Sequence, residues 1–271
     1  MAELEQLVAQ ARAGDAAALE SVVAAIEKDV RRLARRFLWN PQDAEDAAQE
    51  ALVRVVTGLE GFRGDASFRT WVYRVACNTL LSAQPSAMER QALSFEQFEE
   101  ELGRGLADDN ATRAEDALLL EEIKIGCTIG MLLCLDRQHR LAYILGEIME
   151  LEHGEAAAAL QIEPAAYRKR LSRARERINA LMLARCGLVR EENACRCRRR
   201  AATAIELGRV DPEHLLFASS LEQARQFPQV LVEIRRLEEA RRAAALYRSH
   251  GDAEPSRSFV VWLRELVADT R

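Results

Sequence analysis

The chain has 271 residues, of which 49% are apolar, 6% aromatic and 30% charged, and its formal net charge is −5. Many Ala and Leu with few Gly and Pro favour small helical bundles over a β-sandwich, which needs more Val, Thr and Tyr and more turns. No run of about 18 apolar residues occurs, which excludes a membrane-spanning helix, and the acidic start of the chain lacks the apolar core of an export signal.

The six cysteines do not follow the spacing of a secreted disulfide framework. They are Cys77, Cys127, Cys134, Cys186, Cys195 and Cys197. We therefore expect reduced thiols and a cytoplasmic location.

Charge is distributed unevenly along the chain. Residues 164–200 hold twelve Lys or Arg against three Glu, a local balance of +9. Residues 96–122 hold ten acids against two Arg, a local balance of −8. The net charge therefore does not exclude nucleic acid as a partner, because the basic block alone supplies the positive charge that binding to phosphates requires.

Residues 1–84 form the first predicted helical segment. Asn40-Pro41 predicts a helix start, with Asn as the N-cap and Pro at the first helical position. The helix that follows places apolar residues on one stripe, namely Ala47, Ala48, Ala51, Leu52, Val55 and Val56. Ser67 is the expected cap of a second helix, whose inner face holds Phe68, Trp71, Val72, Val75, Ala76 and Thr79.

Three further segments follow in the chain. Residues 85–114 have little apolar density and predict a mobile acidic linker with at most one short helix. Residues 115–186 regain helical periodicity, and residues 187–271 form a last helical stretch. Within it, Asp211-Pro212 and Phe227-Pro228 predict helix starts, and one long helix is expected to carry Leu231, Ile234, Leu237, Ala240 and Leu246 as its apolar stripe. No strand alternation is found, so the predicted fold class is all-α.

Two stretches of the sequence resemble a known family. Residues 43–51 and 62–78, together with residues 13–20, resemble region 2 of extracytoplasmic-function (ECF) sigma factors of bacterial RNA polymerase. Residues 135–181 are similar to region 4 of the same family, which ends in a helix-turn-helix. The resemblance implies two small helical domains, with a region 2 domain at 1–84, the acidic linker at 85–114, a region 4 domain at 115–186 and a helical C-terminal extension at 187–271.

The region 2 resemblance implies two partners, core RNA polymerase and promoter DNA. The residues implied to bind the polymerase are Asp43, Asp46, Gln49 and Glu50. Their carboxylates would meet Arg side chains of the polymerase through charge-assisted hydrogen bonds. The residues implied to contact and open the minus-10 region of the promoter are Arg63, Arg69, Tyr73, Arg74 and Asn78. Among these, Asn78 matches a residue that lines the pocket for a flipped base.

The region 4 resemblance implies a helix at 153–160, a turn at 161–163 and a recognition helix that begins at Pro164. The residues expected to face the minus-35 DNA are Ala165, Ala166, Arg168, Lys169, Arg173 and Arg177. The residues expected on the buried face are Tyr167, Leu171, Ala174 and Ile178. The family usually has Gly at the position of Gln161 and Thr near Ala166, so one phosphate contact is lost here.

The extension beyond residue 186 leaves several interpretations open. Cys186, Cys195, Cys197 and His214 offer ligands that suit zinc, although a simple basic segment around Arg196 is favoured over this set. The apolar stripe of the extension predicts docking on the region 4 domain, on the linker or on a partner such as an anti-sigma or other regulatory protein.

The sequence therefore predicts a sigma factor that recognises and melts a promoter together with core polymerase, without catalytic activity or a cofactor. The alternative is a stand-alone helix-turn-helix regulator of transcription. A zinc or thiol enzyme built on the extension is the rival from another class, but no pair of nucleophile and base and no phosphate-binding Gly loop supports it.

Overall fold

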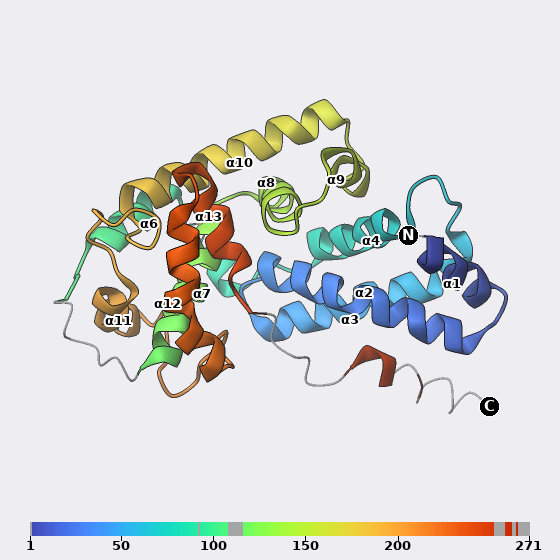
Figure 1. Cartoon of the computed structure of the whole chain (residues 1–271), viewed down its shortest axis with the longest axis horizontal. Coiled ribbons are helices and arrows are strands. Elements are labelled where there is room, and N and C mark those ends of the chain that lie inside the picture. The colour runs from blue at the N-terminus through green and yellow to red at the C-terminus, as the bar shows by residue number, and fades with distance from the viewer. Residues whose placement is uncertain (1, 92, 108–115, 252–257, 262–263, 265–271) are drawn as a thin grey trace. The chain divides into compact units, whose positions relative to one another are not determined.

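The computed structural model describes residues 2–91, 93–107, 116–251, 258–261 and 264 (Figure 1). Every regular element within these ranges is a helix, which confirms the all-α prediction. None of these helices combines the length and the apolar content needed to cross a membrane.

The chain divides into two compact units. Unit 1 takes its described residues from Met1–Pro85, Leu151–Arg168 and Glu254–Arg271, and unit 2 takes them from Ser86–Glu150 and Lys169–Ala253. The first division falls beside the predicted boundary at 84, whereas the predicted boundary at 114 lies outside the described residues. The four-domain division stays a prediction.

Unit 1 is built around one long helix. Its elements are α1 (Ala2–Arg12), α2 (Ala16–Phe37), α3 (Pro41–Thr57), η1 (Leu59–Gly61), α4 (Phe68–Ser82) and α9 (His153–Ala159). The Asp15 side chain caps α2 by accepting from the N–H groups of Ala17 and Ala18 at 2.9 and 3.1 Å. The apolar face of α2 packs against α1, α3 and α4. Its inward-facing apolar side chains between Val22 and Phe37 are fully buried. Burial of this face stabilises the unit.

A buried ionic network joins α2 to α3 in unit 1. Arg31 is 6% exposed and forms ion pairs with Glu27, at 3.0 Å, and with Glu45. Glu27 also accepts a hydrogen bond from the N–H of Phe259 at 2.7 Å, and the Phe259 side chain is buried. The far end of the predicted extension therefore contacts α2, an attachment that the sequence did not predict.

Unit 2 is built around α7, which is apolar on nearly all sides. Its elements are α5 (Ala87–Arg90), α6 (Phe95–Gly103), α7 (Ala117–Leu133), α8 (Arg137–Tyr143), the π-helical turn η2 (Ile144–Ile148), α11 (Cys197–Glu206), α12 (Leu221–Arg236) and α13 (Glu239–Arg248). A further helix, α10 (Pro164–Arg185), begins in the residues of unit 1 and continues in those of unit 2. Because α7 is buried on most of its surface, it needs partners on several sides, and α8, α11 and α12 pack against it.

The predicted linker differs from expectation, because it contains two helices, α5 and α6, and both are tied to the rest of unit 2. Glu89 of α5 forms ion pairs with Arg137 and Arg140 at 2.9 Å each. Glu101 of α6 forms ion pairs with Arg200 at 3.0 Å and with Arg209 at 2.9 Å. The linker is ordered here because these acidic side chains pair with arginines that are far along the chain. The Asp108-Asp109-Asn110 stretch lies outside the described residues.

The extension docks on α7 and on the linker, as predicted. The carboxylate of Glu122 is 1% exposed and accepts hydrogen bonds from the N–H groups of Leu216, Phe217 and Ala218 at 2.9, 2.7 and 2.7 Å. The hydroxyl of Tyr247 donates to the carbonyl of Thr128 at 2.9 Å. Polar groups of α7 therefore hold two separate parts of the extension.

Three details of the extension were predicted wrongly. No helix starts at Asp211, whose side chain instead accepts from the N–H of Glu213 in a turn, at 3.0 Å. Pro228 lies inside α12 rather than at its start, because Ser220 supplies an earlier cap, accepting from the N–H of Gln223 at 3.3 Å. The expected single long helix is divided between α12 and α13.

The Glu89 cluster predicts how stability depends on pH. Burial by itself raises the pKa of Glu89, but the Arg137 and Arg140 guanidinium groups outweigh it and hold this pKa below its ordinary value of 4.5. A depressed carboxyl pKa contributes stability above the unfolded-state pKa and loses it as the pH falls through the folded-state pKa. At pH 7 we expect the wild-type protein to unfold at a higher urea concentration than Glu89→Gln. The difference between the two unfolding midpoints is expected to become smaller below about pH 4.5. A constant difference from pH 7 to pH 3 would contradict this assignment.

Candidate functional site

The α3 face predicted to bind polymerase is exposed in unit 1. Asn40 caps α3, accepting from the N–H groups of Gln42 and Asp43 at 2.8 and 3.4 Å, and Pro41 follows at the first helical position. The opposite face is buried through Ala44, Ala47, Ala48, Ala51, Leu52 and Val55. Small Ala side chains permit close packing of α3 on α2. The positions of the two faces follow the predicted periodicity.

The acidic side chains on this face are accessible. Asp43, Asp46 and Glu50 are exposed, and Gln49 is half-buried. Their contacts are local, since Asp46 accepts from the Gln42 amide at 2.9 Å and Glu50 pairs with Arg54 at 2.5 Å. Exposed pairs of this kind contribute little to stability, so the carboxylates can exchange these partners for others.

The loop before α4 is anchored by aromatic rings. Phe62 and Phe68 are buried with ring centroids 5.3 Å apart, and the Trp71 ring lies 5.6 Å from each of them. Gly64 has a φ of +78°, a conformation that favours glycine. Ser67 caps α4, accepting from the N–H of Thr70 at 3.1 Å. This anchoring fixes the loop that carries Arg63.

The predicted minus-10 residues differ in their accessibility. Arg63 and Asn78 are exposed, and Arg74 is half-buried. The Arg69 side chain is 56% exposed and lies 3.3 Å from the carboxylate of Asp29. These four side chains are accessible along α4 and its preceding loop.

Tyr73 is the exception and corrects the prediction. Its ring is 7% exposed, so it cannot offer a stacking face to a base in this arrangement. Burial raises the pKa of its phenol, and the charge of Asp29 and a hydrogen bond to that carboxylate raise it further. The helical periodicity places Tyr73 beside Val72 on the inner side of α4, where the ring packs in the core.

Asn78 has a partner that the sequence did not predict. Its amide Nδ2 donates to Oε1 of Gln161 at 3.4 Å, and α9 packs against α4 within unit 1. Gln161 follows α9 and has a φ of +54°. A left-handed conformation explains why a Gly suits this position, since a side chain costs about 1 kcal/mol there. In the sequence, the only indication that this residue has a special role was that Gln161 stands where the family usually has Gly.

The predicted helix-turn-helix is present. Helix α9 ends at Ala159, and α10 begins at Pro164, as expected. The four predicted inner residues are buried, namely Tyr167, Leu171, Ala174 and Ile178. The six predicted outer residues are exposed, namely Ala165, Ala166, Arg168, Lys169, Arg173 and Arg177. In unit 2, the Arg177 guanidinium lies 5.7 Å from the centroid of the Phe95 ring.

The predicted zinc set is not assembled as expected. The side chain of His214 is 83% exposed, and its Nδ1 lies 3.1 Å from the carboxylate of Asp211. Burial and the nearby Cys186 together raise the pKa of Cys195 to about 11, against the opposing effect of nearby arginines. His214 therefore lies apart from the cysteines, because the turn at Asp211 turns it toward solvent.

The sequence and structure of this chain are similar to those of known proteins. Residues 22–85 match the family model for Sigma-70 region 2. The RNA polymerase sigma-H factor of Pseudomonas aeruginosa is 32% identical over 183 residues, which cover 65% of this chain and 91% of that protein. The ECF RNA polymerase sigma-E factor of Escherichia coli is 32% identical over 179 residues, which cover 64% of this chain and 91% of that protein.

A solved structure of CnrH in complex with the cytosolic domain of CnrY also matches, with a TM-score of 0.48 and 24% identity over 65% of this chain and 94% of that one. Both sigma-factor relatives are at least 30% identical and are covered over nine-tenths of their length. The chain belongs to the ECF family of RNA polymerase sigma factors.

Proposed function

We propose that this sigma factor binds core RNA polymerase through the exposed α3 residues Asp43, Asp46, Gln49 and Glu50 and recognises promoter DNA through α4 and α10. The observation that carries the proposal is the exposure of acidic side chains on α3 together with the exposure of basic side chains on α10. The acidic face repels DNA and suits a basic protein surface, whereas the basic face suits phosphates.

The promoter contacts divide between the two helices. Arg63, Arg69 and Arg74 lie where cationic groups can hold phosphates, and the Asn78 amide is suited to the edge of an unpaired base. On α10, Arg168, Lys169, Arg173 and Arg177 supply charge, and Ala165 and Ala166 leave space for close approach to the major groove. Tyr73 is omitted because it is buried.

The family consists of initiation factors that catalyse no reaction, and we propose the same for this chain. No cofactor is required by these contacts. A regulatory protein that binds the extension stays a prediction.

Promoter binding is expected to depend on core polymerase. In the free protein the exposed Asn78 amide donates to Gln161 and α9 packs on α4, so this amide must exchange its partner before it can contact a base. We expect sequence-specific binding to duplex promoter DNA only after core polymerase is added. Fluorescence anisotropy with matched promoter and scrambled duplexes, each with and without core enzyme, measures this. Equal sequence-specific affinity without core enzyme would instead support the stand-alone regulator.

Asn78→Ala is expected to reduce open-complex formation while leaving holoenzyme assembly unchanged. Hydrogen bonds from a side-chain amide to a base edge are worth about 1–3 kcal/mol, which corresponds to roughly fivefold to 150-fold in the equilibrium for opening. Permanganate reactivity of the minus-10 thymines measures opening, and co-purification measures assembly. Gln161→Ala is the matched control, because it removes the same hydrogen bond and keeps the Asn78 amide. If both variants lost promoter opening to a similar extent, the effect would come from the hydrogen bond between Asn78 and Gln161 and not from a contact of Asn78 with DNA.

A further inference from the structure

A cavity of about 520 Å³ lies in unit 2, where α7, α11 and α12 meet the segment that follows α10. Helix α7 lines it with residues at i, i+3, i+4 and i+7, namely Ala117, Leu120, Glu121 and Lys124. Helix α12 lines it with the same spacing, through Ala224, Phe227, Pro228 and Leu231. Each helix therefore presents one continuous face to the cavity, whose volume suits a small organic molecule.

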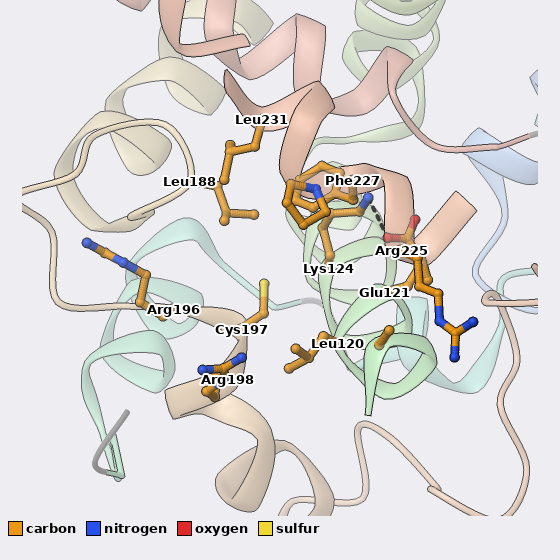
Figure 2. Close-up of a pocket in the computed structure, with 13 residues that line it drawn as sticks. Leu120, Glu121, Lys124, Leu188, Arg196, Cys197, Arg198, Arg225, Phe227 and Leu231 are labelled. Carbon is orange, nitrogen blue, oxygen red and sulfur yellow. Dashed lines mark ion pairs between the residues drawn. The ribbon is translucent and has the colours of Figure 1, made fainter. Parts of the chain in front are cut away.

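The walls of the cavity are mostly apolar. Leu120, Leu188, Leu231 and the Phe227 ring line it and are half-buried. Figure 2 shows Leu188, Leu231 and Phe227 close together, with the Cys197 sulfur pointing toward them. Half-buried apolar side chains lose further contact with water when an apolar group fills the space between them. The walls therefore favour an occupant with an apolar body.

A buried ion pair forms one side of the cavity. The Lys124 Nζ lies 2.7 Å from the carboxylate of Glu121, and the two side chains are 2% and 8% exposed. The same ammonium lies 3.5 Å from the centroid of the Phe227 ring, a cation–π contact (Figure 2). Among the residues that line the cavity, this carboxylate and this ring are the groups that attract a cation, and Lys124 already engages both. A cationic ligand is therefore disfavoured.

The charge balance of the lining is positive. Arg196, Arg198 and Arg225 line the cavity besides Lys124, whereas Glu121 is the only acid among the described lining residues, which gives a balance of +3. Backbone carbonyls of the preceding loop accept from the Arg196 guanidinium at 2.5 and 3.3 Å, and they fix its position without cancelling its charge. Arg225 is exposed at the rim. A carboxylate suits this side of the cavity, because it can accept two parallel hydrogen bonds from a guanidinium.

We propose that this cavity binds a small organic carboxylate with an apolar body. The body fills the space between the leucines and the Phe227 ring, and the carboxylate pairs with the arginines at the start of α11. The chemical class follows from two independent features, the apolar walls and the +3 balance of the lining. An acid with an alkyl chain or a ring satisfies both features, whereas a small polar anion or a neutral apolar molecule satisfies only one.

The ligand would tie the extension to the predicted region 4 segment. Helix α7 belongs to that segment, α11 and α12 belong to the extension, and Leu188 follows the end of α10 by three residues. A ligand that binds only the folded arrangement of these elements stabilises it in proportion to its occupancy. The lining residues are separate from those proposed to contact polymerase and promoter. The proposal therefore goes beyond that function and is tested on the free protein.

The test titrates the full-length protein at neutral pH with octanoate and with 1-naphthoate, and calorimetry is expected to show one site per chain. Octan-1-ol and octylammonium keep the chain and change the head group, and each is expected to bind about tenfold more weakly or worse. Acetate is expected to bind at least about a hundredfold more weakly, since each buried CH₂ group contributes roughly fourfold in affinity. Absence of binding by both acids, or equal affinity for octanoate and octylammonium or acetate, would overturn the proposal.

A matched pair of variants places the ligand in the cavity. Leu231 lines it, whereas the next residue, Val232, is 50% exposed and lies outside the lining. Leu231→Trp fills the cavity and is expected to weaken octanoate binding by about a hundredfold or more, while Val232→Trp leaves it unchanged. Octanoate is also expected to slow hydrogen exchange of the α7, α11 and α12 amides. Equal affinity in the two variants, or protection confined to unit 1, would overturn the assignment.

A second pair tests the charge without filling the cavity. Arg198→Gln with Arg225→Gln is expected to weaken octanoate binding by about tenfold or more. The control is Arg236→Gln with Arg241→Gln, because these side chains are 70% and 75% exposed and lie outside the lining. Equal weakening in both pairs would attribute the binding to diffuse surface charge and overturn the proposal. If Leu231→Trp does not fold, the comparison of these two pairs decides.

Discussion

A protein that carries Asp46→Arg and Glu50→Arg is expected to lose its affinity for core RNA polymerase by about a hundredfold or more, because like charges placed across an interface cost several kcal/mol. Both side chains are exposed and have only local partners, so the free energy of unfolding should change by less than about 1 kcal/mol. Competition for core enzyme against a labelled wild-type sigma factor measures the affinity, and urea unfolding measures the stability.

The control for this variant reverses the same number of charges elsewhere in unit 1. Glu3 and Glu60 are exposed and lie outside α3. Glu3→Arg with Glu60→Arg changes the net charge by the same amount and is expected to retain core binding. If both double variants lose affinity equally, the effect comes from net charge, and the α3 face is not the binding surface.

Glu101→Ala is expected to loosen the contact of α11 with α6 and to destabilise unit 2 by about 3–5 kcal/mol, because it leaves a buried guanidinium without its counter-ion. Arg200 is 4% exposed and pairs with Glu101 at 3.0 Å, and Arg209 pairs with the same carboxylate at 2.9 Å. Hydrogen exchange of the α6 and α11 amides, together with urea unfolding, measures the loss.

The neighbouring acid provides the control. Glu100 pairs with Arg104 one turn away, and both side chains are more than half exposed. Glu100→Ala is therefore expected to cost less than about 0.5 kcal/mol. The Glu101 effect should persist at high salt, because a buried pair is screened little. Strong salt dependence, or equal losses in both variants, would show that the docking rests on diffuse surface charge instead.

The helices of the first domain could be predicted from the sequence because their signals are local. Asn40 and Ser67 occupy the cap positions that their side chains suggested, and the alanines of α3 lie on the buried face. The boundary between α9 and α10 follows from the turn residues before Pro164, and the stripe from Tyr167 to Ile178 is buried as its spacing predicts. In each case the determining contacts lie within one or two helical turns.

The exposure of the charged helix faces of the site could be predicted from the sequence. The burial of one individual side chain, Tyr73, could not. The exposed acids of α3 and the exposed cations of α10 follow from helical period. The burial of Tyr73 was missed because a Tyr at the edge of an apolar stripe can point either way, and its bond to Asp29 on α2 settles the choice. The linker was expected to be mobile because its apolar density is low, whereas Glu89 and Glu101 pair with arginines far along the chain.

The sequence by itself determined the caps of α3 and α4, the buried faces of α3 and α10 and the family to which the chain belongs, since each depends on residues that are close in sequence. Only the tertiary structure decided which distant groups meet. Glu101 and Arg200 are 99 residues apart, Glu122 and Leu216 are 94 apart, and Asn78 and Gln161 are 83 apart. No periodicity encodes such pairs, because they form only when the apolar faces of helices far apart in the chain pack together.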